Sequence, residues 1–402
     1  MKTKSVIDFK YVFFAIAISF GSVPVYMIAP QLYNLKFDLP FADIAIALLI
    51  AKFFDILQTP YLGYLLDKFY YSAAQKIKLF SFLFLPASLV FYLLLFPPTI
   101  FKNMMAYLFT IILILNFVII NLLAINYYAL IKHFHQSTHD KLTVFREIFF
   151  FIGISVSLIL SANFDVRIVV FIIYSIVLII GTFFISKIKN TINLPKTEKS
   201  ICWSEIMNFM GEYKFFLIFH FMNIFAFACT SSLVLIFINK YLGLADHSSI
   251  FLLIYTTAIF IGFYACYKFI KKINKHIVYT GFALLNIVFF SQTYFIMPGS
   301  LQYFSVICCF AGFFQAADFA LPVNIFNSLV PKNKNAASYY SIWFLVMKIA
   351  LAAGSIFSFS AAAYLAKINF IETNFLLVSY VVIPCVVKFI ALIFFIIFHC
   401  KK

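Results

Sequence analysis

Residues 167–187 read RIVVFIIYSIVLIIGTFFISK, and no charged side chain lies between Arg167 and Lys187. A helix needs about 20 apolar residues to cross the hydrocarbon core of a bilayer, and this run has that length. The run is continuously apolar and does not alternate with polar residues, which favours a helix over a strand of an outer-membrane barrel. The stretch therefore predicts one membrane-spanning helix.

Similar runs recur along the whole chain. Of its 402 residues, 64% are hydrophobic and 11% are charged, and the mean hydropathy is +1.03, which excludes large soluble domains. We expect an all-α polytopic membrane protein with twelve transmembrane helices. The predicted helices cover residues 11–33, 41–66, 79–97, 104–131, 143–163, 167–187, 214–238, 249–267, 276–297, 301–330, 337–365 and 373–398.

The formal net charge of +16 does not indicate nucleic-acid binding, because the basic residues punctuate the spans and do not cluster on one face. Most of the 30 basic residues fall at the termini and in alternate loops, which predicts that both termini are cytoplasmic and that the chain is multi-pass in the cytoplasmic (inner) membrane. The opposite loops carry only Lys36, Lys102, Arg167, Lys240 and Lys367.

Seven cysteines lie in or beside apolar segments without a C-x-x-C pair, so neither disulfides nor a zinc site is expected. His133, His135 and His139 share a short loop that lacks a rigid ligand frame, and we expect no metal there.

The longest polar stretch divides the chain into two halves. We predict an N-terminal six-helix bundle at 1–186, a cytoplasmic linker at 187–213 with a short amphipathic surface helix near 203–210, and a C-terminal six-helix bundle at 214–402. A weak internal echo supports this division, because GYLLDK at 63–68 is matched by GFYACYK at 262–268. Two related bundles with a site between them are typical of alternating-access transporters.

Three stretches carry a family resemblance. Residues 53–68 read FFDILQTPYLGYLLDK, and 126–147 and 321–354 agree with the same family in order and spacing. The chain resembles the glycoside, pentoside and hexuronide cation symporters, a branch of the major facilitator superfamily that includes melibiose carriers. The resemblance implies the major facilitator fold and cation-coupled transport. It does not carry sugar specificity over, because Thr59 and Ala124 stand where the family typically has acids.

Lys52, Asp55 and Thr59 share one helix face, which we expect to line the central cavity because a membrane-embedded charge needs a partner or water. Asp55 and Thr59 are therefore candidates for binding a coupling ion, Na⁺ or H⁺. Lys52 and Lys348 are candidate charge partners, and the resemblance implies that Lys348 approaches Asp55. The alternative is that Asp55 only neutralises a lysine and holds the halves together.

Six residues are candidates for lining the solute cavity. The resemblance places Arg146 there, although an arginine anchored at the membrane interface is an equal alternative. Arg146 and Glu147 are adjacent and are expected to point to different sides of their helix. For the polar pairs in the second half, ordinary hydrogen bonds between helices are the more common fate. The candidates are Arg146, Tyr128, His220, Asn223, Gln315 and Asp318.

Gly63 and Asp67 have the G-x-x-x-D spacing of the superfamily's cytoplasmic gate motif, by resemblance. A glycine permits close helix approach, and an aspartate can cap the N-terminus of a facing helix. The alternative is a solvated loop acid. Lys388, in the final span, can pair or partly snorkel to the surface, and we assign it no role.

The sequence therefore predicts a secondary active transporter of a small polar solute. An enzyme is not expected, because no nucleophile lies with a base and no cluster of histidines and acids marks one membrane face. A transport-inactive sensor or scaffold of the same fold is the alternative, given the two missing acids. We expect no cofactor besides a coupling ion, the lipid bilayer and the solute as partners, and a monomer.

Overall fold

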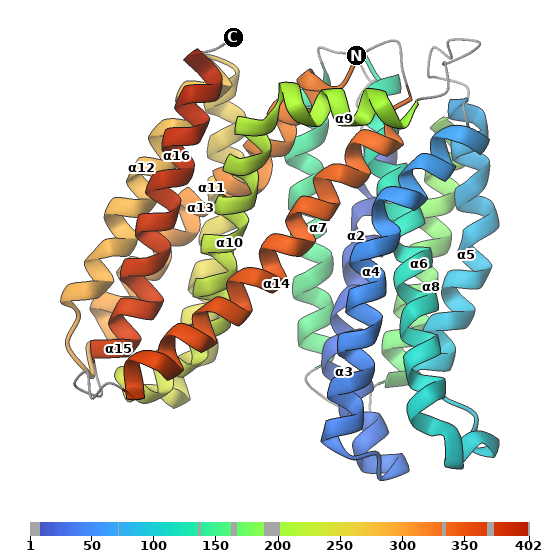
Figure 1. Ribbon diagram of the computed structural model, residues 1–402, viewed down its shortest axis with the longest axis horizontal. Coiled ribbons are helices and arrows are strands. Elements are labelled where there is room, and N and C mark those ends of the chain that lie inside the picture. The colour runs from blue at the N-terminus through green and yellow to red at the C-terminus, as the bar shows by residue number, and fades with distance from the viewer. Residues whose placement is uncertain are drawn as a thin grey trace. The chain divides into compact units, whose positions relative to one another are not determined.

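The computed structural model describes residues 9–70, 72–135, 138–161, 167–188, 202–331, 335–367 and 374–400. Within these ranges the chain is helical and has no strand, which confirms the predicted all-α fold. The helices (Figure 1) are α2 (Phe14–Phe20), α3 (Ser22–Phe37), α4 (Phe41–Phe69), α5 (Ala73–Leu95), α6 (Met105–Leu130), α7 (His139–Ser161), α8 (Arg167–Ile188), α9 (Trp203–Glu212), α10 (Lys214–Ile236), α11 (Ser248–Ile270), α12 (Lys275–Ser291), α13 (Leu301–Leu329), α14 (Ala337–Lys367), α15 (Asn374–Leu377) and α16 (Ile383–Cys400).

Eleven helices in the described ranges are long and apolar enough to cross a membrane, and the first of these spans runs over Phe9–Phe37. Helix α4, with 29 residues, is about 43 Å long at 1.5 Å per residue and adds a further helix of sufficient length. The prediction of the helix start near residue 79 was wrong by about two turns. Helix α5 begins at Ala73 because Ser72 and Gln75 form a capping box that satisfies the first backbone N–H groups.

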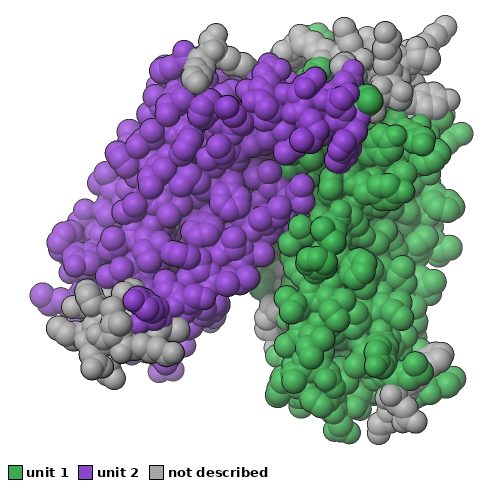
Figure 2. Space-filling model, in the orientation of Figure 1, with its two compact units in different colours: residues 1–202, 330–342 green, residues 203–329, 343–402 purple. Residues whose placement is uncertain are grey.

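The chain forms two compact units (Figure 2). The first contains residues 1–202 and 330–342, and the second contains 203–329 and 343–402. Helix α14 therefore begins in the first unit and continues in the second. Residues 189–201 of the predicted linker and the termini at 1–8 and 401–402 lie outside the described residues, so the sidedness of the linker and termini stays a prediction.

Helix α9 confirms the short amphipathic helix predicted near 203–210. Its Ile206 and Phe209 are buried, whereas Trp203 and Met207 are about half exposed. This alternation follows the helical repeat, so one face of α9 is buried within the second unit and the other is exposed.

Each unit has its own helix packing. In the first, α4 packs on α6, and α2 packs on α7 and α8; in the second, α11 packs on α13, and α10 on α16. Small residues permit α11 and α13 to approach closely. A Cβ added to Gly262 of α11 would lie 2.8 Å from the Cβ of Ala316 of α13. Large apolar side chains such as Leu49 and Phe82 remain exposed on the helices, which is typical of a lipid-facing surface.

A proline lies at position 60 of α4, beside the predicted coupling residues. Proline has no backbone N–H, so it cannot donate to the carbonyl oxygen of Ile56 four residues earlier. The carbonyl oxygen of Ile56, the residue after Asp55, therefore lacks its usual hydrogen-bond donor within the helix.

Candidate functional site

Asp55 lies on the buried face of α4 with a side chain that is 2% exposed. Its Oδ2 is 2.9 Å from Nζ of Lys52, one turn earlier on the same helix. Its Oδ1 accepts a 2.7 Å hydrogen bond from Nδ2 of Asn121 on α6. Both carboxylate oxygens are thus engaged within the first unit. Sequence reasoning missed Asn121, because a single asparagine in an apolar span gives no signal of which helix it faces.

Lys52 is more exposed than its partner, at 36% of its side chain. Its ammonium group is also 3.4 Å from the Tyr26 hydroxyl and lies 5.3 Å from the centre of the Phe117 ring, which provides a cation–π contact. The Lys52 ammonium that pairs with Asp55 is therefore also held by aromatic side chains. Such a cation can leave the carboxylate without losing every stabilising contact.

Thr59 is fully buried one turn after Asp55, and its hydroxyl donates a 2.6 Å hydrogen bond to the backbone carbonyl of Asp55. A hydroxyl that donates still has lone pairs on its oxygen. Thr59, the Asp55 carboxylate and the carbonyl of Ile56 therefore provide the oxygen atoms that a hard cation such as Na⁺ prefers, all within little more than one helical turn.

Lys348 is buried on the part of α14 that belongs to the second unit, whereas Asp55 belongs to the first. The pairing of these two residues, implied by the family resemblance, stays a prediction. Within the first unit, Lys52 provides the cationic partner of Asp55.

Arg146 and Glu147 form a second buried charge cluster in the first unit. Nε and Nη2 of Arg146 donate to Oε1 of Glu147 at 3.0 and 2.8 Å. The expectation that these neighbours point to different sides of the helix was wrong. Both side chains are long and almost fully buried, so the guanidinium folds back onto the neighbouring carboxylate.

Tyr128 completes this cluster. Its ring lies 3.6 Å below the Arg146 guanidinium, and its hydroxyl donates to Oε1 of Glu147 at 3.4 Å. Nη1 of Arg146 has no hydrogen-bond partner among the described residues. The predicted solute residues Arg146 and Tyr128 are therefore brought together in one buried cluster.

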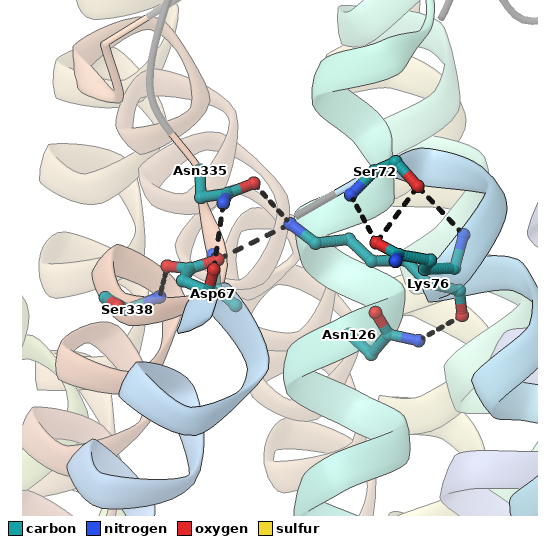
Figure 3. A network of polar contacts seen from close by, with 8 residues as sticks. Asp67, Ser72, Lys76, Asn126, Asn335 and Ser338 are labelled. Atoms are coloured by element: carbon teal, nitrogen blue, oxygen red, sulfur yellow. Dashed lines mark hydrogen bonds and ion pairs between the residues drawn. The ribbon is translucent and has the colours of Figure 1, made fainter. Parts of the chain in front are cut away.

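Asp67 caps the N-terminus of α14 inside the first unit (Figure 3). Its carboxylate oxygens accept hydrogen bonds from the backbone N–H groups of Ala337, at 3.1 Å, and Ser338, at 2.7 Å. Lys76 of α5 is 3.4 Å from the same carboxylate and donates to Oδ1 of Asn335 at 3.2 Å. The described side chains of this network are almost completely buried, which excludes the alternative of a solvated loop acid.

Asp67 belongs to the last turn of α4, where the helix dipole disfavours an acid. The network offsets this cost, because the carboxylate meets the positive end of α14 and the Lys76 ammonium. Gly63, one turn earlier, makes room for α14: a Cβ there would lie 2.9 Å from the carbonyl oxygen of Ala337. The predicted gate residues therefore lie together at the start of α14.

Sequence reasoning missed Lys76 and Asn335 in this network. Lys76 was assigned to a loop because the start of its helix was placed too late. The capping-box residues Ser72 and Gln75 were the available signal, since they move the helix start ahead of Lys76. Asn335 had no comparable signal.

The second unit holds the remaining predicted residues in two places. His220 of α10 stacks on Trp343 with ring centres 3.4 Å apart, and Asn223 is buried on the same helix. Gln315 and Asp318 of α13 lie instead with Lys388 of α16, which forms an ion pair with Asp318. All four residues were predicted to line the solute cavity. In the structure they form two separate groups, one on α10 and one on α13.

A family profile described as MFS/sugar transport protein matches residues 7–402. A bacterial homologue of the iron transporter ferroportin, in an outward-facing state, is similar in structure with a TM-score of 0.75 and 13% identity, covering 98% of this chain and 99% of that chain. The E. coli fucose:proton symporter has a TM-score of 0.71 and 14% identity, covering 99% and 98%. At these identities the structures share the fold alone. No curated protein sequence matches the chain significantly.

These findings confirm the expected major facilitator fold, and the matched family is one of transport proteins. With a family match over nearly its whole length, an all-α membrane fold and buried charges on membrane-length helices, the chain belongs to the major facilitator superfamily, in the family of MFS sugar transport proteins.

Proposed function

We propose that the protein is a secondary active transporter that moves a small polar solute across the cytoplasmic membrane together with Na⁺ or H⁺. Membership of a transport family supports the movement of a solute. The proposal that transport is coupled to a cation rests on Asp55. Its side chain is 2% exposed, lies in the middle of a 29-residue helix, and has a lysine as its partner that a cation can displace. Ionisable residues at membrane depth are costly and mark ion or solute pathways.

In the proposed cycle, the arriving cation takes the place of the Lys52 ammonium at Asp55. A proton binds to the carboxylate itself, whereas Na⁺ takes oxygen ligands from Asp55 and Thr59. Lys52 keeps its contacts to Tyr26 and Phe117 while it is released. The Arg146–Tyr128 cluster in the same unit is the proposed contact for hydroxyl or carboxylate oxygens of the solute.

Uptake into proteoliposomes tests this function. Purified protein is screened with sugars, amino acids, organic acids and nucleosides under separate sodium and proton gradients. Accumulation of one solute above its external concentration, driven by one of the gradients, supports the proposal. If no solute accumulates under either gradient while labelled solutes still bind, the alternative of a sensor or scaffold gains support.

Thr59→Ala distinguishes the two ions. If Na⁺ is the coupling ion, loss of the hydroxyl oxygen should weaken apparent Na⁺ affinity about tenfold or more, because one hard ligand is lost. If H⁺ is the ion, the pH dependence of uptake should change little. The measurement is initial uptake rate against sodium concentration and against pH.

Thr110→Ala is the matched control for this change. Thr110 also lies in the first unit and its hydroxyl also bonds to a carbonyl four residues earlier, but it belongs to α6 and is remote in sequence from Asp55. An equal loss of sodium affinity in both variants would attribute the effect to helix stability and not to the site.

We further propose that the Asp67 network latches the cytoplasmic side of the transporter. Asp67→Asn should shift the population towards inward-open states, because Lys76 loses its counter-charge while the asparagine still caps α14. A distance probe across the cytoplasmic mouth measures the shift, with Asp43→Asn as the control on the same helix. An unchanged distance distribution would end the latch assignment.

The sidedness of the basic residues supports an orientation with both termini in the cytoplasm. This orientation places the end of α4 and the start of α5, with Asp67 and Lys76, at the cytoplasmic face.

A further inference from the structure

The second unit contains a cavity of about 380 Å³ that is unrelated to Asp55. Every residue that lines it belongs to the second unit, from α10, α11, α12, α13, α16 and the turns between them. Its walls are mainly apolar and aromatic, and include Phe227, Phe251, Phe290 and Phe304. The volume lies near the lower end of the range of small-molecule sites, about 300–1,000 Å³.

One part of the wall carries a cluster of polar groups. Lys388, Gln315 and Asn286 all line the cavity. Nζ of Lys388 donates to Oε1 of Gln315 at 3.1 Å, and Nδ2 of Asn286 donates to the same oxygen at 2.8 Å. An apolar chamber with a few convergent polar groups is the usual form of a site for an amphipathic ligand.

Asp318 lies behind this cluster. It forms an ion pair with Lys388 but does not line the cavity, and its side chain is 2% exposed against 12% for Lys388. The cation therefore faces the chamber and its counter-charge does not. The Tyr279 hydroxyl of α12 also lies within hydrogen-bonding reach of the Asp318 carboxylate, as a neutral donor.

The protonation chemistry follows from these positions. A lysine ammonium has three donors, and Asp318 and Gln315 occupy two of them. An incoming carboxylate can take the third and then compete with Asp318 for the charge. Two carboxylates that share one cation leave one excess negative charge in an apolar surrounding, and one proton from water can neutralise it.

We propose that this cavity binds a small organic carboxylate with an apolar or aromatic body, and that its binding is linked to the uptake of one proton by Asp318. The ligand carboxylate pairs with Lys388, the Lys388–Asp318 pair opens, and one proton from water protonates Asp318. The charge within the site is unchanged, because one anion and one proton enter together.

Other titratable groups lie near the pair. Tyr255 and Cys266 of α11 and Tyr279 of α12 lie near Asp318, and Cys385 lies near Lys388. Tyrosine and cysteine have ordinary pKa values of about 10 and 8.5 and are neutral near pH 6. These neighbours therefore contribute no proton when the number of protons bound is measured near pH 6.

Calorimetric titration of the purified full-length protein tests the proposal, with phenylacetate and hexanoate as probes and phenylacetamide as the neutral match. Titrations in two buffers of different ionisation enthalpy give the number of protons bound. We expect phenylacetate or hexanoate to bind with uptake of about one proton, and affinity to fall up to tenfold per pH unit on the alkaline side. Phenylacetamide should bind at least tenfold more weakly than phenylacetate.

Variants separate the roles of the two charges. Asp318→Asn should keep carboxylate binding but abolish proton uptake and the pH dependence. Lys388→Met combined with Asp318→Asn removes both charges, leaves no buried ion unpaired, and should bind carboxylates at least 100-fold more weakly. Lys268→Met, an exposed lysine on α11, should behave as the unaltered protein.

Three results would overturn the proposal: no binding of either carboxylate by the unaltered protein, equal binding of phenylacetamide, or unchanged proton uptake in Asp318→Asn. The site does not depend on the assignment of Asp55. The same titrations on Asp55→Asn should give unaltered binding, so failure of the coupling proposal and failure of this one are distinguishable.

Discussion

Asp55→Asn should abolish gradient-driven accumulation of the transported solute, so that the internal concentration no longer exceeds the external one. Asparagine keeps the size of the side chain and can still accept from Asn121, but it cannot take a proton or neutralise Na⁺. Exchange of labelled for unlabelled solute should persist, because it needs no net ion movement. Proteoliposomes with an imposed gradient measure the first property, and counterflow measures the second.

Asp43→Asn, in the first turn of the same helix, is the matched control and should leave accumulation unaltered. A double-mutant cycle with Lys52 and another with Lys348 identify the partner of Asp55. Removing the true partner alone should lower the yield of folded protein more than removing both members, because the single change leaves a buried carboxylate unpaired. Unaltered accumulation in Asp55→Asn would refute the coupling role.

Lys76→Met should cause the largest loss of stability of the changes considered, about 3–5 kcal/mol, because it leaves the Asp67 carboxylate buried without its counter-charge. It also removes the donor to Asn335. Thermal unfolding of purified protein, and the fraction of protein that elutes as a monodisperse peak, measure the effect. Lys78→Met, exposed on the same helix, should stay within about 0.5 kcal/mol of the unaltered protein.

Combining Lys76→Met with Asp67→Asn should recover much of this loss. The pair is then neutral, and asparagine remains a good helix cap. If the double variant is as unstable as the sum of the single ones, the two residues are not coupled and the network does not stabilise the first unit in the way inferred.

Apolar runs were sufficient to predict an all-α membrane protein, because the bilayer imposes both the length and the composition of a spanning helix, whereas the major facilitator fold was implied by the family resemblance. The face shared by Asp55 and Thr59 could also be predicted, since both lie on one helix with a fixed repeat. Lys52, one turn before Asp55, was predicted as a partner by the same repeat, whereas the partner on another helix could not be predicted. Asn121 is brought to Asp55 by packing between helices, and one sequence carries no periodic signal for that register.

For Gly63 and Asp67 too, the sequence predicted the residues of one helix but not their partner on another. The spacing of Gly63 and Asp67 indicated helix capping, and Asp67 does cap α14. Lys76 was missed because its helix start was misplaced, and Lys388 because snorkelling was a reasonable fate for a lysine in a terminal span. In both cases a lysine is buried because an aspartate from another helix is there to meet it.

The first unit is discontinuous along the chain, and this affects how the protein is made. Asp67 meets a backbone N–H 271 residues later, so the unit lacks its last segment when residue 202 leaves the ribosome. At about 5–20 residues per second, roughly 7 to 27 seconds pass before α14 begins. During that interval Asn335, which accepts a hydrogen bond from Lys76, has not yet been synthesised, and neither has the helix that Asp67 caps. A gene split after residue 202 would therefore place residues 330–342, which complete the first unit, on the other fragment.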